Sequence, residues 1–155
     1  MKQPGIKFSR TTFVLLLALS VIASSALAIE YVSVSDSNAI LYETPSLKGK
    51  KLFVINRYTP LEKVVSLENW LKVRDSSGGM AWIEKRAVSE KQYVVVRATT
   101  ANVRQEPDEK SPVLFQVSQN VAIESLGVNG GGWIKARHMD GSSGYIKSIE
   151  VWGAE

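Results

Sequence analysis

The second half of the chain repeats the first half. Four segments of the first half return in the same order: 31–34 as 93–96, 39–45 as 101–107, 69–74 as 132–137, and 81–85 as 144–148. The offset is 62 residues up to the prolines and 63 from the tryptophans onward, so one loop differs in length by one residue. A duplicated unit of this size predicts two small domains in tandem.

Each repeat has the apolar pattern of a β-protein. Apolar residues alternate or run in short blocks, and turn residues interrupt them at the intervals typical of short strands. The predicted strands are 31–34, 39–42, 51–56, 61–67, 70–75 and 80–84 in the first repeat, and 93–98, 101–104, 113–117, 121–126, 133–137 and 144–147 in the second. No segment after residue 28 has a sustained helical period with caps. The sequence therefore predicts an all-β fold.

The segment before the repeats has the pattern of a secretory signal. Basic residues open the chain, residues 13–22 are apolar except for Ser20, and Ala26 and Ala28 are the small residues that a signal peptidase reads. We therefore predict a signal helix over residues 1–28, cleavage after Ala28, and a periplasmic or extracellular destination. An uncleaved membrane anchor is the alternative, because residues 13–28 are nearly long enough to cross a bilayer if flanking residues help, but an anchor would have no use for the cleavage site.

The charge of the chain argues against nucleic acid as a partner. The net charge is +4, but three of the 19 basic residues lie in the signal and none of the 15 acidic residues does, which leaves 16 against 15. Residues 29–91 contain ten basic and eight acidic side chains, and residues 92–155 contain six and seven. Neither half has the concentrated positive charge that a phosphate backbone requires.

A glycine-rich run, residues 129–132, precedes the strand that begins at Trp133. Such a run invites comparison with phosphate-binding loops, but here no Lys followed by Ser or Thr and no helical pattern comes after it. We predict that it is a hairpin turn.

The second repeat resembles the bacterial SH3-like domains of cell-envelope proteins. The residues that carry the resemblance are 101–107, 111–113 leading to Gly127, 132–137, Gly141 and 144–146. The first repeat is a looser copy, with Ile40 and Tyr42 where the motif usually has Asn and Arg. The resemblance implies an all-β chain of two tandem small SH3-like β-barrels, residues 29–90 and 91–155, after the signal. The polar stretch 89–92 is expected to be a simple connector.

The tryptophans lie on the charged side of their strands. In the strand 70–74, aliphatic side chains alternate with Trp70 and two basic residues, and the strand 133–137 repeats this arrangement with Trp133. Two interpretations follow. The rings either cover a barrel mouth or the seam between the repeats, or they line a groove in which aromatic rings stack on sugars or peptide planes.

The resemblance implies a set of binding residues. In SH3-type domains the tryptophan that opens this strand lines the ligand groove, and Trp70 and Trp133 hold that position here. The last strand pair carries a further aromatic residue, Tyr145 in the second repeat and Trp82 in the first. Only the second repeat retains the polar residues of the motif beside its tryptophan, so if either repeat binds a ligand, the second is the one we expect to do so. The implied ligand-binding residues are Asn102, Arg104, Glu106, Trp133, Tyr145, Trp70 and Trp82.

Catalysis is difficult to build from these residues. The chain has no cysteine, and His138 is its only histidine, so a Cys-His pair and a metal site with several histidines are both excluded. We therefore expect a protein that is not an enzyme, with no catalytic residue, metal or cofactor. A hydrolase that works through His138 is an alternative.

The sequence as a whole favours a non-catalytic, exported binding module. The resemblance implies peptidoglycan or an envelope peptide as the ligand, while the proline-peptide groove of eukaryotic SH3 domains lacks its Pro and Tyr here. The membrane is expected to be a partner only through an uncleaved signal. The competing hypothesis is a structural or adaptor protein that binds another envelope protein and buries its aromatic residues between the repeats.

Overall fold

The computed structural model describes residues 29–154, so the predicted signal segment 1–28 lies outside the described residues. The described residues form β-strands joined by turns, with two short 3-10 helices, η1 (Lys85–Ala87) and η2 (Ser148–Glu150). None of residues 29–154 belongs to a helix that is long and apolar enough to cross a membrane. The predicted all-β fold is confirmed.

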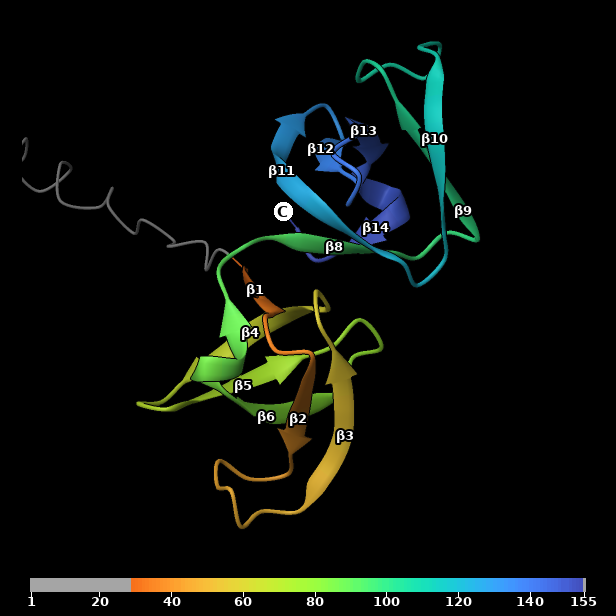
Figure 1. Ribbon diagram of the computed structural model, residues 1–155. Coiled ribbons are helices and arrows are strands. Elements are labelled where there is room, and N and C mark those ends of the chain that lie inside the picture. Colours follow the sequence, from red (N-terminus) through yellow and green to blue (C-terminus); the bar gives the residue numbers. More distant parts are fainter. Residues whose placement is uncertain (1–28, 155) are drawn as a thin grey trace, which may run out of the picture.

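The strands form two sheets, one for each repeat (Figure 1). The first sheet contains β1 (Glu30–Val34), β2 (Asn38–Tyr42), β3 (Lys51–Asn56), β4 (Pro60–Ser66), β5 (Trp70–Arg74), β6 (Met80–Glu84) and β7 (Val88–Ser89). The second contains β8 (Tyr93–Val96), β9 (Thr100–Arg104), β10 (Val113–Ser118), β11 (Ala122–Gly130), β12 (Trp133–Arg137), β13 (Ser143–Lys147) and β14 (Val151–Trp152). The strand orders, β3-β2-β6-β5-β4-β1-β7 and β10-β9-β13-β12-β11-β8-β14, are equivalent.

The two sheets remain open, which differs from the closed barrels that the sequence led us to expect. In the first sheet, β3 pairs only with β2 and β7 pairs only with β1. The closing strand β7 has two residues, so it offers too few backbone groups to complete a ring. The same holds for β10 and β14 in the second sheet. Each repeat therefore has a free edge strand, β3 or β10.

Each sheet encloses its own apolar core. The first core consists of Val32, Val34, Ala39, Leu41, Leu61, Leu71, Val73, Ala81, Ile83 and Ala87. The second consists of Val94, Val96, Ala101, Val103, Val117, Ile123, Ile134, Ala136, Ile146 and Val151. The predicted alternation along β12 is confirmed, because Ile134 and Ala136 are fully buried while Lys135 and Arg137 are exposed. Trp133 lies on the face of β12 that points away from the core.

The glycine-rich run forms the turn between β11 and β12, as predicted. Gly130, Gly131 and Gly132 all have positive φ angles, 74°, 57° and 83°. Glycine adopts positive φ angles readily, whereas residues with a side chain rarely do. The run therefore serves the hairpin geometry, and no helix follows it directly within the described part of the chain.

The two repeats contact each other through a structured seam. The Tyr93 backbone N–H donates to the Ser33 hydroxyl at 3.1 Å, and the Gln92 side chain donates to the Tyr31 carbonyl, also at 3.1 Å. The rings of Tyr58 and Tyr93 stack with their centroids 4.5 Å apart. The stretch 89–92 is therefore more than a simple connector, because its last residue and its neighbour Tyr93 bind the first repeat.

Candidate functional site

The outer face of the second sheet brings most of the predicted binding residues together. Arg104 on β9 lies opposite Tyr145 on β13, and Tyr145 lies opposite Lys135 on β12. Trp133, at the start of β12, lies opposite Lys147 at the end of β13. All these side chains point away from the core, because their neighbours along each strand are buried in it and side chains alternate between the two faces of a strand.

The polar residues of this set are held by local hydrogen bonds. Arg104 Nη1 donates to the Ser111 carbonyl at 2.7 Å, and the Ser111 hydroxyl accepts from the Glu106 backbone N–H at 2.9 Å. The Asn102 side-chain oxygen accepts from Gln116 at 2.9 Å. Arg104 and Asn102 thus hold the β9–β10 hairpin, while Glu106 stands exposed in its loop.

Trp133 offers little surface to a ligand. Only 8% of it is exposed, although it is not part of the aliphatic core. Its neighbour across the strands, Lys147, forms an ion pair with Glu109 at 2.5 Å. This arrangement fits the interpretation in which the indole ring lies flat and covers its own domain.

The first repeat carries three aromatic rings at the equivalent places. Tyr42 on β2 lies opposite Trp82 on β6, and the rings of Tyr42 and Trp70 form a T-shaped pair with centroids 5.3 Å apart. The Lys72 ammonium lies 6.0 Å from the centre of the Trp82 ring. Trp70 and Trp82 are both partly exposed, whereas Tyr42 is only 5% exposed. We call Tyr42, Trp70 and Trp82 the aromatic face.

Tyr42 was not among the predicted binding residues. It stands where the second repeat has Arg104, a position at which the first repeat departs from the motif. The signal that could have found it is the alternation along β2, because Tyr42 follows the core residue Leu41 and must share a face with Ile40.

A charged pair borders the aromatic face. Glu84 lies opposite Trp70, and its carboxylate accepts from Arg86 Nε at 2.7 Å and from Arg86 Nη2 at 3.1 Å. Hydrogen bonding to Glu84 raises the pKa of Arg86, which therefore remains charged. The aromatic face thus lies between Lys72 and a bidentate Glu–Arg pair.

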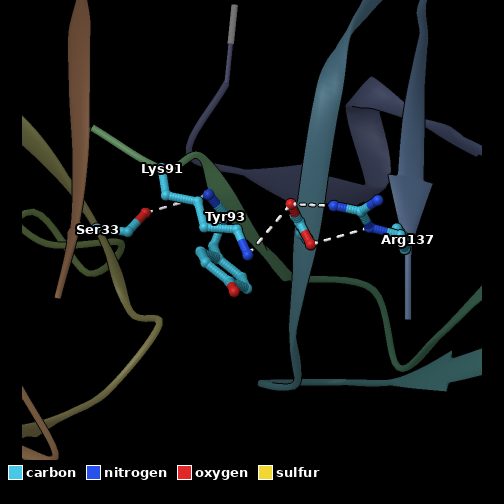
Figure 2. A network of polar contacts seen from close by, with 5 residues as sticks. Ser33, Lys91, Tyr93 and Arg137 are labelled. Atoms are coloured by element: carbon cyan, nitrogen blue, oxygen red, sulfur yellow. Dashed lines mark hydrogen bonds and ion pairs between the residues drawn. The ribbon is translucent and has the colours of Figure 1, made fainter. Parts of the chain in front are cut away.

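A second polar cluster, which the sequence did not predict, lies beside the seam (Figure 2). Glu124 accepts from Arg137 Nη2 at 2.7 Å and from Arg137 Nε at 3.1 Å, and its carboxylate lies 3.3 Å from the Lys91 ammonium. The hydrogen bond from Arg137 lowers the pKa of Glu124, against the opposing effect of burial. Hydrogen bonds with Tyr93 and then Glu124 raise the pKa of Lys91.

This cluster borders a hollow of about 380 Å³ that Tyr58 and Tyr93 also line. The first repeat has the equivalent pair, since Arg74 Nη1 donates to both Glu62 oxygens at 3.0 Å. The Glu–Arg pair thus recurs between equivalent strands, β4 and β5 in the first repeat and β11 and β12 in the second. We therefore infer that it stabilises the fold and does not bind a ligand.

His138 lies in the turn between β12 and β13. Its Nδ1 is 3.2 Å from Asp140 Oδ1, which also accepts the Ser142 backbone N–H at 2.8 Å. The hydrogen bond from the Ser142 backbone makes the largest contribution to lowering the pKa of Asp140. Both His138 and Asp140 are exposed, and the ring of His138 packs beside Phe115. The geometry is that of a hairpin turn.

Within residues 29–154, no cluster of three or more His, Cys, Asp or Glu side chains is placed to hold a metal.

Three solved structures are similar to this chain. They are NlpC2 from Trichomonas vaginalis (19% identity, TM-score 0.37, covering 80% of this chain and 48% of that one), NlpC1 from the same organism (18%, 0.38, 83% and 47%), and an NlpC/P60 family protein from Bacillus cereus (15%, 0.33, 81% and 57%). The chain spans about half the length of these proteins. The comparison with curated proteins gave no match.

The comparison with family models agrees with the duplication seen in the two sheets. The model of the bacterial SH3 domain matches residues 35–90 and, a second time, residues 97–153. One match falls on each sheet, and together they cover well over half of the chain. The chain therefore belongs to the bacterial SH3 domain family and carries two of these domains in tandem.

Proposed function

We propose that this protein is an exported, non-catalytic binding module that recognises peptidoglycan or an envelope peptide. The observation that carries the proposal is the aromatic face of the first repeat, where Trp70 and Trp82 remain partly exposed beside Lys72. Rigid aromatic rings provide apolar contact at low entropic cost, and they stack on peptide planes and on the apolar faces of sugars.

The chemistry of the ligand follows from the groups around the rings. The stem peptides of peptidoglycan offer amide planes and carboxylates. The amide planes fit against Trp82 and Trp70, and a carboxylate is attracted to the Lys72 ammonium at the edge of the face. A partly exposed cation of this kind gives orientation more than affinity.

The two repeats contribute differently in this proposal. In the second repeat, Arg104 and Asn102 hold a hairpin and Trp133 is covered, so Tyr145 and Glu106 are the predicted residues with free surface. In the first repeat, two partly exposed tryptophans, Trp70 and Trp82, lie beside a cation, Lys72, while Tyr42 is buried beneath them. We therefore assign the main binding surface to the first repeat, and not to the second repeat that the sequence favoured, and give the second repeat a supporting role.

Retention of the purified chain on isolated peptidoglycan sacculi tests the proposal. Trp82→Ala should reduce retention about tenfold, the loss expected when a central aromatic anchor is truncated. The matched variant Tyr145→Ala, at the equivalent position of the second repeat, should reduce it less. Ile149→Ala, at a highly exposed residue outside the face, is the control. Equal retention of Trp82→Ala and the control would refute binding through this face.

One observation favours the second hypothesis, an adaptor for another envelope protein. The repeats contact each other through aromatic rings in the seam, Tyr58 on Tyr93 and Tyr31 on Trp152. A rigid pair of domains presents a defined surface to a protein partner. Under this hypothesis sacculi do not retain the chain, whereas the variants of the aromatic face lose a protein partner captured by cross-linking from cell envelopes.

A further inference from the structure

The loops that join the first two long strands of each repeat carry opposite charges. We call residues 43–51 the basic turn and residues 105–113 the acidic turn; they occupy equivalent places in the two repeats. The basic turn contains three lysines and one glutamate, a net charge of +2, and the acidic turn contains three acidic residues and one lysine, a net charge of −2. The charged side chains that set these signs are Lys48, Lys50 and Lys51, and Glu106, Asp108 and Glu109.

Most of these charges have no counter-ion in the molecule. Among residues 29–154, none of the ion pairs involves Lys48, Lys50 or Lys51. On the acidic turn, Glu109 pairs with Lys147, while Glu106 and Asp108 form no ion pair within the same part of the chain. All six side chains are exposed. Two patches of opposite sign, each with charges that form no ion pair in this part of the chain, thus lie on one molecule.

Apolar side chains lie next to both turns. Phe53 and Val54 on β3 are 65% and 67% exposed, and Val113 and Leu114 on β10 are 44% and 49% exposed. Both strands are edges of their sheets, with unpaired backbone groups along one side. Each charged turn therefore adjoins an apolar, unpartnered edge, a combination that marks interaction surfaces.

The two turns extend in opposite directions. Figure 1 shows the loop between β2 and β3 at the lower end of the molecule and the loop between β9 and β10 at the upper end. One molecule therefore cannot bring its own two turns together, but the basic turn of one copy can meet the acidic turn of the next. A contact between two different surfaces of identical chains is heterologous, so it propagates head to tail.

We propose that copies of this protein associate head to tail, with the basic turn and the β3 edge of one copy docked on the acidic turn and the β10 edge of the next. The partner is a second copy because the chain itself carries a surface of opposite charge at the equivalent place. This inference goes beyond the proposed function, since neither turn contains a residue of the aromatic face; Glu106 of the acidic turn belongs only to the supporting surface of the second repeat.

Sedimentation velocity of the chain from Ile29 onward tests the association, because both cores lie within this part. In 0.1 M salt we expect the average mass to rise with concentration beyond that of a dimer. The screening length falls from about 10 Å at 0.1 M salt to about 3 Å at 1 M, so the dissociation constant should rise about tenfold or more over that range.

Two matched variants locate the contact. Lys48→Gln with Lys50→Gln removes the net charge of the basic turn, and Glu106→Gln with Asp108→Asn removes that of the acidic turn, leaving the Glu109–Lys147 pair intact. Each variant alone should be monomeric. Because each retains the surface that the other lacks, an equal mixture should form dimers and no larger species. Recovery of association in the mixture also shows that both variants are folded.

Three outcomes would overturn the proposal. The first is a chain that remains monomeric at every concentration up to about 0.5 mM, which would leave at most about 4–5 kcal/mol of association free energy. The second is association that neither salt nor the variants change, which would indicate apolar clustering. The third is association lost in only one variant, which would indicate pairing of two identical edges. None of these outcomes bears on retention by sacculi, so the two proposals fail independently.

Discussion

Tyr58 and Asn120 occupy the same turn position in the two repeats, and both have a positive φ, 70° and 65°. Asparagine tolerates this left-handed conformation, whereas a residue as large as tyrosine rarely adopts it. Tyr58 differs from Asn120 in its surroundings, because its ring stacks on Tyr93 of the other repeat. The contact between the repeats therefore accounts for a tyrosine at a position that the local backbone does not favour.

Substitutions at Tyr58 separate the turn from the stack. Tyr58→Ala should destabilise the protein more than Tyr58→Asn by about 1 kcal/mol, because both remove the stack but only asparagine suits the left-handed turn. Denaturant unfolding measures the difference. As a control, Asn120→Ala should lose about 1 kcal/mol through the turn alone. Equal stability of the two Tyr58 variants would mean that turn strain has no influence here.

The tryptophans differ in how much they support the fold. Trp133→Ala should cost about 3–5 kcal/mol of unfolding free energy, since it removes a ring that is only 8% exposed. Trp82→Ala should cost less than about 2 kcal/mol, because the ring is partly exposed and loss of surface groups is milder. Urea unfolding of both variants checks this. A larger loss for Trp82→Ala would identify it as a structural residue and weaken its assignment to binding.

At the level of the strands, the alternation of apolar and polar residues in the sequence was enough to predict the longer strands. Each of the twelve predicted segments overlaps a strand of the structure. The two strands that were missed, β7 and β14, have two residues each, too few to show any period. Strand β11 runs on to Gly130, beyond its predicted end, because the ladder continues past register shifts at Gly127 and Gly130. Glycine can adopt the backbone angles that such a bulge requires. Gly127, which the sequence pattern suggests as the end of the strand, therefore lies inside it.

The candidate site was predictable to the same extent. Alternation placed Trp70, Trp82, Trp133 and Tyr145 on the outer face, and the registers of β5, β6, β12 and β13 agree with it. What alternation does not determine is how neighbouring side chains cover one another. The burial of Trp133 and the hydrogen bond from Arg104 to the Ser111 carbonyl both depend on the conformation of a loop.

The Glu–Arg pair between β11 and β12 gives stability a specific dependence on pH. The pKa of Glu124 is lowered in the folded protein, chiefly by the hydrogen bond from Arg137, from an ordinary value of 4.5. A lowered folded-state pKa stabilises the protein above the unfolded pKa, and this stabilisation is lost as the pH falls through the folded pKa. Glu124→Gln should therefore destabilise the protein at neutral pH, and the difference from the parent chain should shrink below pH 4.5.

Unfolding free energies of the two chains between neutral and acid pH measure this effect. Glu106→Gln is the control, because Glu106 is exposed and forms no ion pair within residues 29–154. Its difference from the parent chain should be small at every pH. If the difference in unfolding free energy between Glu124→Gln and the parent chain did not change with pH, the pKa of Glu124 would be the same in the folded and unfolded states.

At the scale of the whole molecule, the duplication was evident from the sequence but the seam was not. The seam joins Tyr58 to Tyr93, Ser33 to the Tyr93 backbone, and Tyr31 to Trp152, so its partners are far apart in the chain. Neither repeat contains a pattern that states which face meets the other, because that choice depends on the relative orientation of two complete domains. Only the structure reveals which faces of the two domains meet.

Gly153 is the position where the packing of the two domains is most sensitive to a single atom. It lies in the second repeat with a φ of 115°, and a Cβ added there would come within 2.6 Å of the Pro60 Cβ and 2.9 Å of the Tyr93 carbonyl oxygen. Pro60 is fully buried at the start of β4, in the first repeat. A methyl group at residue 153 would therefore press on Pro60 of the first repeat and on the Tyr93 carbonyl of its own repeat, so we expect the two domains to shift apart.

Gly153→Ala should thus open the seam, and Gly141→Ala is its matched control. Gly141 also has a positive φ, 93°, but a Cβ there would meet nothing within 4 Å. Both variants should lose about 1 kcal/mol or more through the backbone. Only Gly153→Ala should also accelerate hydrogen exchange of the Tyr93 amide, whose bond to Ser33 crosses the seam. Unchanged exchange in that variant would mean that the domains shift without losing their contacts, and the seam would then be a sliding rather than a fixed junction.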